Sequence, residues 1–391
     1  MKVLISGAGI TGPTLAWWLR RYGVDVVIVE QASHLRTGGY VIDFWGAGFD
    51  IAERMSLLPQ IREAGYAMQE VRIVDDANRR IGGFSVDVFR RLTAGRYVSL
   101  PRGDLASILF HSIENDAEVL FGETIEHLDD TGSGVRVDLS GGSSRDFDAV
   151  IGADGLHSRV RELAFGPESQ FETYLGYCVA AFEVDGYRPR DELVFVMHTE
   201  VGRQVARFTL RGDRTMFLFI FKEQGGIAIP MEDTEAQKSV LRDRFRDCGW
   251  ETAQILKEMD RAGSLYFDRV SQIRMEEWWR GRVALTGDAA FCVSLLGGQG
   301  SALAMIGAYF LAHELKNGGD PTAAFKRYHA SLDGFLRSKQ KDAENFAGWF
   351  APSSRIRLFL RNQATKLLGI PLVADLAGRN GLLDRITLPP E

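Results

Sequence analysis

The sequence predicts a mixed α/β (α+β) protein in which an antiparallel sheet is inserted into a domain built on a parallel sheet. Residues 2–6, 10–22 and 24–30 have the patterns of a buried strand, a helix and a second buried strand. Residues 193–221 instead contain short alternating runs separated by glycine turns, a pattern typical of antiparallel strands. Apolar strands at 149–151 and 283–286 then return the chain to the first sheet.

The composition is that of a globular protein acting on a small molecule. With 391 residues, 45% of them hydrophobic and 25% charged, the chain can bury the cores of two domains. A net charge of -6 provides no broad basic surface, so neither nucleic acid nor a membrane is expected as a partner. Cys178, Cys248 and Cys292 are odd in number and widely spaced, which favours a reducing compartment over a disulfide framework or a zinc cluster. The chain starts without a signal-peptide pattern, so we expect a cytoplasmic protein, and a monomer is the simplest oligomeric state.

Changes in pattern along the chain predict two domains and a helical tail. The first domain binds a nucleotide and is discontinuous, with residues 1–70, 100–170 and 270–320. The second is a substrate-binding sheet domain of residues 71–99 and 171–269. A C-terminal helical segment follows at 321–391, and further helices are expected over 50–64, 102–115 and 300–315.

A glycine cluster at the first strand–helix junction predicts a Rossmann-like dinucleotide site. Gly7 permits the tight turn, Gly9 lets the backbone approach the phosphates, and Gly12 lets the helix pack closely on the strand. The N-terminus of the helix offers backbone N–H groups to the anion. Glu30, at the end of the second strand, would accept hydrogen bonds from the adenosine ribose. This motif alone leaves FAD and NAD as alternatives.

Two further clusters favour FAD. Asp154 and Asp288 each follow a predicted strand, at the positions where ligands of α/β sheets bind. An aspartate there can accept hydrogen bonds from a polyol such as the ribityl chain of FAD, a role we assign to Asp288. Gly298 and Gly300 open the next helix, whose positive end would face the flavin pyrimidine ring and stabilise reduced, anionic flavin by about 0.3–2 kcal/mol. The predicted cofactor is therefore FAD.

These three clusters, in this order, resemble those of the class A FAD-dependent aromatic hydroxylases (monooxygenases), and the resemblance covers nearly the whole chain. It implies that the glycine cluster and Glu30 bind the ADP part of FAD. It also implies that Asp154, in the run from Asp154 to Arg161, lies near both FAD and NAD(P)H. In Gly287-Asp288, the aspartate would hold the ribityl chain.

The same resemblance extends to two arginines and to a narrower group. Arg102 matches an arginine that the family places near the FAD pyrophosphate, and Arg36 resembles a residue near the entry of the flavin or the nicotinamide. Residues 38–43 and the helical C-terminal extension are similar to those of the tetracycline-inactivating monooxygenases. The sequence departs from the family at Phe291 and Leu295, where His and Pro are usual.

The resemblance implies a monooxygenase that consumes NAD(P)H and O2 and hydroxylates an aromatic or polyketide-like molecule, such as a tetracycline, through a C4a-hydroperoxyflavin. NAD(P)H would bind transiently, because the chain has one dinucleotide fingerprint. In the inserted sheet, we expect Phe217 and Phe219 to line the substrate site, with His198 and Arg203 as polar contacts. Neither a catalytic side chain nor a metal site is predicted, because the flavin carries the chemistry.

Three alternatives stay open. A flavin-dependent halogenase would carry a Trp-x-Trp-x-Ile-Pro signature, which the sequence lacks. A flavin reductase or dehydrogenase without oxygen transfer is compatible with the departures at Phe291 and Leu295. The third alternative is a non-catalytic FAD-binding protein, which would show no substrate-stimulated oxidation of NAD(P)H.

Overall fold

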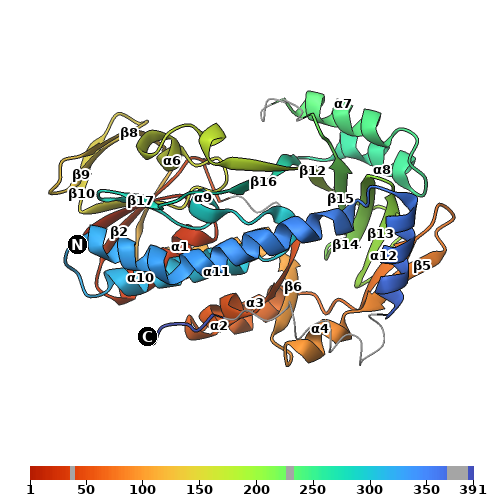
Figure 1. Ribbon diagram of the computed structural model, residues 1–391, viewed down its shortest axis with the longest axis horizontal. Coiled ribbons are helices and arrows are strands. Elements are labelled where there is room, and N and C mark those ends of the chain that lie inside the picture. Colours follow the sequence, from red (N-terminus) through yellow and green to blue (C-terminus); the bar gives the residue numbers. More distant parts are fainter. Residues whose placement is uncertain (36–39, 226–232, 368–385) are drawn as a thin grey trace.

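The computed structural model describes residues 1–35, 40–225, 233–367 and 386–391 and confirms the predicted α/β class (Figure 1). A six-stranded sheet and a seven-stranded sheet lie at opposite ends of the molecule, and one long helix runs between them. Every helix in the described ranges is too short or too polar to serve as a membrane span.

The six-stranded sheet contains a run of buried parallel strands. Its order is β17 (Trp279–Arg280), β18 (Val283–Leu285), β11 (Ala149–Gly152), β1 (Lys2–Ser6), β2 (Asp25–Glu30) and β7 (Glu118–Phe121). All neighbours pair in parallel except β17 and β18. β1 and β11 are apolar almost throughout, as expected for central strands covered on both faces. Because these strands are parallel, their carboxyl ends meet at one edge of the sheet.

The seven-stranded sheet combines residues from two distant parts of the chain. Its order is β16 (Leu265–Ile273), β12 (Glu172–Asp185), β15 (Arg214–Lys222), β14 (Arg203–Thr209), β13 (Val194–Glu200), β4 (Glu70–Val74) and β5 (Arg80–Ser85). All neighbours pair in antiparallel fashion except β4 and β13. The strands predicted within 193–221 are therefore confirmed as β13, β14 and β15.

Two smaller sheets and the helices complete the described fold. A three-stranded sheet contains β8 (Ile125–Asp130), β9 (Val135–Leu139) and β10 (Ser144–Phe147), and β3 (Val41–Trp45) pairs with β6 (Tyr97–Pro101). The helices are α1 (Thr11–Arg21), α2 (Ala47–Arg54), α3 (Leu58–Ala64), α4 (Asp87–Leu92), α5 (Arg102–His111), α6 (Arg159–Ala164), α7 (Thr234–Phe245), α8 (Thr252–Glu258), α9 (Asp288–Phe291), α10 (Gly300–Leu315), α11 (Pro321–Phe350) and α12 (Arg355–Leu367). The single helix predicted over 50–64 is wrong: Ser56 adopts a φ of 61° between α2 and α3, and left-handed backbone interrupts a helix.

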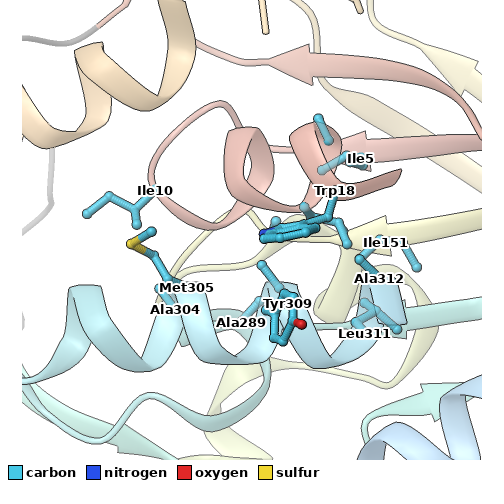
Figure 2. Close-up of a cluster of buried hydrophobic side chains, with 14 of the residues drawn as sticks. Ile5, Ile10, Trp18, Ile151, Ala289, Ala304, Met305, Tyr309, Leu311 and Ala312 are labelled. Carbon is cyan, nitrogen blue, oxygen red and sulfur yellow. The ribbon is translucent and has the colours of Figure 1, made fainter. Parts of the chain in front are cut away.

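Helix α10 packs on α1 through an aromatic contact in the main core. Trp18 of α1 lies over Tyr309 of α10, with ring centroids 4.7 Å apart and planes at 66° (Figure 2). Both rings are fully buried. At the other side of α10, a β-carbon on Gly48 of α2 would lie 2.6 Å from Ala302 Cα, so these two helices approach through small residues. The contacts with α1 and α2 fix the position of the α10 N-terminus.

Helix α11 connects the two sheets. In Figure 1 it runs from the six-stranded sheet toward the seven-stranded one. The side-chain amides of Gln340 in α11 and Gln272 in β16 are both buried. Gln340 Nε2 donates to the carbonyl of Ile273 at 2.7 Å, and Gln272 Nε2 donates to the carbonyl of Gln340 at 2.8 Å. Buried amides with their hydrogen bonds satisfied fix the register between the helix and the strand.

The packing of α1 on α10 generates a prediction about stability. Replacing Trp18 by alanine removes a fully buried indole, so we expect the free energy of unfolding to fall by about 3–5 kcal/mol. Urea unfolding followed by circular dichroism measures this change. The neighbouring Trp17 is only partly buried and is the matched control, whose replacement by alanine should cost much less. Equal losses in the two variants would contradict the assignment of Trp18 to the central contact.

Candidate functional site

Three chain segments that bear predicted site residues meet at the carboxyl edge of the six-stranded sheet. The glycine cluster follows β1, Asp154 follows β11, and Asp288 follows β18. Since β18, β11 and β1 are consecutive parallel neighbours, the three segments lie side by side. Glu30, the last residue of β2, lies on the other side of β1.

The three glycines of the first turn have different surroundings. Gly7 has a φ of 106°, and a β-carbon on it would lie 2.5 Å from the carbonyl oxygen of Ala153. A β-carbon on Gly12 would lie 1.9 Å from the carbonyl oxygen of Gly7. Nothing lies within 4 Å of the corresponding position on Gly9. Gly7 and Gly12 are therefore required by packing, whereas Gly9 borders open space.

The open space beside Gly9 suits an anion. Helix α1 starts without a side-chain cap and without an acidic residue in its first turn. Its first N–H groups and its positive end are thus available to a phosphate. Glu30 is oriented by the backbone, because Oε2 accepts from the N–H of Ala8 at 2.8 Å and Oε1 accepts from the N–H of Ala32 at 2.9 Å. The remaining lone pairs of its carboxylate are suited to ribose hydroxyls.

Asp154 stabilises the turn that follows it by accepting hydrogen bonds. Its Oδ1 accepts from Ser158 Oγ at 2.5 Å, and its Oδ2 accepts from the N–H of Val160 at 3.1 Å. Burial raises the pKa of this carboxyl, while these hydrogen bonds lower it. Both oxygens are engaged within the domain, so the carboxylate shapes the start of α6. The contact with FAD and NAD(P)H that the resemblance implies stays a prediction.

Asp288 lies in a partly buried cluster with Arg102, Tyr40, Tyr266 and Cys292. Burial raises the pKa of the Asp288 carboxyl, and the positive charge of Arg102 lowers it. The same arginine acts on Tyr40, whose pKa burial raises to about 12, and on Tyr266, whose pKa is raised well above its ordinary value. The rings of Tyr40 and Tyr266 are 5.9 Å apart. A carboxyl, a guanidinium and two neutral phenols therefore converge at this edge.

Arg102 can bind an anionic ligand at the start of α5. It is the first residue of α5, and its backbone N–H donates to the carbonyl of Tyr40 at 3.0 Å. The guanidinium of Arg102 makes neither a hydrogen bond nor an ion pair with any of the described residues. A partly buried cation in this position is compatible with a pyrophosphate ligand, and the contact of Arg102 with FAD stays a prediction.

The start of α10 provides a second open helix end. Gly298 adopts a left-handed φ of 65°, and β-carbons on Gly298 and Gly300 would meet nothing within 4 Å. The first turn of α10 has neither an acidic residue nor a side-chain cap. The residues at the edge thus fit FAD, with one open helix end for phosphate and one for the flavin ring.

The two departures from the family pattern have structural roles. The ring of Phe291 packs on Trp278 at 4.9 Å, and a β-carbon on Gly307 of α10 would lie 2.6 Å from it. Phe291 thus fills the core between α9 and α10. Leu295, in the turn before α10, packs on the seven-stranded sheet. Neither Phe291 nor Leu295 takes the place of a residue to which we assign FAD binding.

One face of the seven-stranded sheet is turned toward this edge. Apolar side chains from β12, β15 and β16 pack there with the turn before α10 and with the end of α11. Phe195, Met197 and Leu218 continue the same face along β13 and β15. The members that pack with the turn are Tyr177, Val179, Leu218, Ile220, Tyr266, Leu295, Leu296 and Phe350. An apolar wall therefore faces the FAD-binding residues.

The predicted substrate contacts Phe217 and Phe219 are wrong, because they lie on the opposite face. Phe195 pairs with Phe208, and Phe208 pairs with Met216, so these three share a face that Phe217 cannot share. Both phenylalanines are fully buried under α7 and α8, where Phe219 contacts Phe245 with ring centroids 4.9 Å apart.

His198 and Arg203 are also wrong as substrate contacts. His198 pairs with Val205, which pairs with Phe219, so it lies on the face covered by α7 and α8. Arg203 donates to Glu200 Oε2 and to Asp247 Oδ1, the latter at 2.7 Å beyond the end of α7. Arg36 lies outside the described residues.

The sequence reasoning missed an ion-pair cluster that joins the two sheets. His157, in the turn before α6, lies between Glu168 Oε1 at 3.0 Å and Asp268 Oδ1 of β16 at 3.5 Å. Hydrogen bonds to Asp268 and Glu168 raise the pKa of His157 to about 10. Arg161, which is fully buried, donates to Glu168 Oε2 at 2.7 Å. The signal in the sequence was an acidic residue, Asp268, between Tyr266 and Val270 on one face of the strand.

Comparisons with known proteins agree with this geometry. The family model described as FAD binding domain matches residues 1–330. The uncharacterized protein Rv1260 of Mycobacterium tuberculosis (strain ATCC 25618 / H37Rv) is 40% identical over 347 residues, covering 86% of this chain and 91% of that protein. A flavin-dependent monooxygenase of Legionella longbeachae serogroup 1 (strain NSW150) is 33% identical over 368 residues, covering 91% of this chain and 90% of that protein. The crystal structure of tetracycline destructase Tet(51) is similar with a TM-score of 0.84 and 30% identity, covering 100% of this chain and 99% of that one.

The surroundings of the glycines predict different consequences for two substitutions. Gly9→Ala should leave the stability of the FAD-free protein unchanged, because its β-carbon meets open space, but it should lower FAD affinity at least ~10-fold by obstructing the phosphate. Gly12→Ala should destabilise the FAD-free protein itself. Thermal unfolding and flavin fluorescence titration separate the two effects. A Gly9→Ala protein with normal FAD affinity would place the phosphate elsewhere.

The His157 cluster predicts a dependence of stability on pH. The folded pKa of about 10 lies above the ordinary value of about 6.5, so the contribution is fully present below about pH 6.5 and is lost as the pH rises through about 10. The difference in Tm between the wild type and His157→Gln should therefore shrink from pH 6 to pH 10. The exposed His127, replaced by glutamine, is the control and should show no such trend. A constant difference for His157→Gln would argue against the ion pairs.

Proposed function

The chain belongs to the FAD-binding family of flavin-dependent monooxygenases, and we propose that it hydroxylates a flat aromatic or polyketide-like molecule using NAD(P)H and O2. In the proposed reaction, NAD(P)H supplies two electrons as a hydride, and one proton is consumed. One oxygen atom enters the substrate and the other leaves as water. NAD(P)H is proposed to bind transiently.

The observation that carries this proposal is the apolar wall facing the FAD-binding edge. Leu218 and Phe195 are only partly buried on that wall, while the adjacent residues along each strand, Phe217 and Val196, are fully buried on the opposite face. A flat apolar ligand gains most from such a surface, and a few polar groups at its rim fix its orientation. Tyr40 and Tyr266 lie beside the FAD-binding edge. The hydroxyl of Tyr266 donates to Asp268 Oδ2 at 3.4 Å and can accept a hydrogen bond, and the hydroxyl of Tyr40 can donate one to a phenol or enol oxygen.

FAD, when bound, supplies the redox and oxygen-transfer chemistry. The residues of the chain would bind and orient it: the N–H groups at the start of α1 would hold the pyrophosphate with Arg102, and Asp288 would accept from the ribityl hydroxyls. The positive end of α10 stabilises negative charge on the pyrimidine ring. Leu295 and Tyr177, which pack together beside this turn, exclude water from the site.

The phenols of Tyr40 and Tyr266 stay protonated at neutral pH. Burial raises the pKa of Tyr40 to about 12, and the pKa of Tyr266 is raised as well. Each can therefore hold a proton next to the oxygen of a bound substrate without losing it to the solvent. This supports an electron-rich ring or enol as the group that is hydroxylated.

A tetracycline is the substrate we propose to test first. Tetracycline destructase Tet(51) is 30% identical to the chain over its whole length, and a tetracycline combines a flat fused-ring body with phenol and enol oxygens. Other phenols, quinones and polyketides of similar size belong in the same panel.

The function predicts substrate-stimulated consumption of NAD(P)H. Purified full-length protein loaded with FAD should oxidise NAD(P)H at least ~10-fold faster with its substrate than without, and labelled O2 should add one labelled oxygen atom to the product. Asp288→Asn should lower FAD content, because the amide removes one acceptor of the ribityl hydroxyls.

Other outcomes would identify the alternatives. Fast NAD(P)H oxidation that yields only peroxide with every compound in the panel would favour a flavin reductase. Retention of FAD without any stimulated oxidation would favour a non-catalytic FAD-binding protein. A halogenated product in the presence of halide would favour a halogenase.

A further inference from the structure

A second cluster of reactive side chains lies on the opposite face of the seven-stranded sheet from the FAD-binding edge. It contains His198 and Glu200 of β13, Cys248 after α7, and Asp76 in the turn between β4 and β5. The ligand atoms of the first three lie within 4.8 Å of one another. His198 and Glu200 border an open cavity of ≈ 610 Å³, to which Asp76 and Arg203 also contribute. The FAD chemistry uses none of these side chains.

The hydrogen bonds of His198 determine which ring nitrogen is free. The ring is buried, and its Nδ1 lies 3.2 Å from the carbonyl oxygen of Val74. A carbonyl only accepts, so Nδ1 carries a proton and donates it. Nε2 then faces Asp76 Oδ1 at 3.3 Å and Glu200 Oε1 at 3.5 Å. The Nε2 atom therefore faces two carboxylate oxygens, an arrangement of donor atoms that can share one cation.

Three consecutive residues after α7 hold the cluster together. Cys248 brings its thiol to Glu200. The N–H of Gly249 donates to Glu200 Oε1 at 2.9 Å, and a β-carbon on Gly249 would lie 2.3 Å from Asp76 Oδ1. Trp250 stacks on the ring of His198, with centroids 6.1 Å apart. The three residues thus contact Glu200, Asp76 and His198, the groups that surround His198 Nε2.

We propose that His198 Nε2, Cys248 Sγ, Glu200 Oε1 and Asp76 Oδ1 form a structural zinc site. Bonds of about 2.0–2.3 Å to a tetrahedral zinc ion place neighbouring nitrogen and oxygen ligands roughly 3.3 Å apart and nitrogen and sulfur roughly 3.6 Å apart. The two nitrogen–oxygen distances, 3.3 and 3.5 Å, already match, and the thiol of Cys248 lies within 4.8 Å of the ligand atoms of His198 and Glu200. Nitrogen and sulfur donors exclude magnesium and calcium, which prefer oxygen.

The surroundings of the ligands fit this assignment. Val74 fixes the tautomer of His198, as a backbone carbonyl commonly does for a zinc-bound imidazole. Arg203 Nε donates to Glu200 Oε2 at 2.9 Å, which leaves Oε1 directed at the cluster. The open cavity provides the entry path. The ion would join β13, the β4–β5 turn and the segment after α7, so its expected effect is on stability.

Zinc binding must displace a proton from Cys248. Burial raises the pKa of this thiol to about 12, so it is protonated in the metal-free protein at neutral pH. Thiolate is the form that binds zinc, so binding should release about one proton per ion. A carboxylate-only site would release none.

The test uses metal-stripped, full-length protein loaded with FAD. Zinc titrated against a chromophoric chelator should bind with one ion per chain, raise the Tm and release a proton. Cobalt(II) should give the near-ultraviolet absorption of a thiolate–cobalt bond. Cys248→Ser and Glu200→Gln should each lower zinc affinity by more than ~100-fold, beyond the 10–100-fold typical of residues that only orient a ligand. Cys178→Ser, which removes a buried thiol within the seven-stranded sheet, is the matched control and should bind zinc normally.

Two results would overturn the proposal. Wild-type protein that shows neither zinc binding nor the cobalt–thiolate absorption would mean that these four side chains do not share a metal ion. Unchanged zinc affinity in Cys248→Ser would place the metal elsewhere. Both results are read from the wild type or from a folded variant, so a variant that fails to fold does not decide the question. FAD content and NAD(P)H oxidation, measured on the same samples, test the proposed function separately.

Discussion

The contact between Gly12 and the carbonyl of Gly7 is the constraint on which the candidate site depends. With no β-carbon at Gly12, α1 can begin directly over the end of β1, within a distance that any other residue would obstruct. The same demand recurs at Gly287, where a β-carbon would lie 2.4 Å from Thr11 Oγ1 of α1. Since β18, β11 and β1 are parallel neighbours, this close packing brings Asp288 to the start of α1. The open position at Gly9 is left between them.

The second constraint is the junction between the two sheets, which is polar although both adjoining surfaces are apolar. His157 and Asp268 pair across it, and Arg161 and Glu168 continue the pair into the six-stranded domain. Buried charges are tolerated only when they are paired and hydrogen-bonded, so this cluster permits few relative positions of the sheets. Helix α11 adds the reciprocal amide contacts of Gln340 with β16. The space proposed for flavin and substrate is thus bounded by fixed elements.

The two faces of the seven-stranded sheet serve different purposes. One face carries Leu218 and Tyr266 toward the FAD-binding edge, and the other is covered by α7 and α8. The second face also carries His198 of β13, where we propose a metal ion. Redox chemistry and the proposed structural metal are thereby separated by the thickness of one sheet, which keeps the thiol of Cys248 away from the flavin.

The sequence by itself determined the strands and helices that carry the candidate site and the residues of the first turn. The glycine spacing, the aspartates after the strands and the small-residue helix from Gly300 are local patterns, and local geometry explains each of them. The prediction that Phe217 and Phe219 contact the substrate was wrong, because alternation along a strand shows which side chains share a face. It does not show which face meets another domain. That choice depends on where α7 and α8 pack. His157 with Asp268, and His198 with Cys248, lie far apart in the chain, so only the tertiary structure, which sets the register of the strands and the packing between sheets and helices, could bring them together.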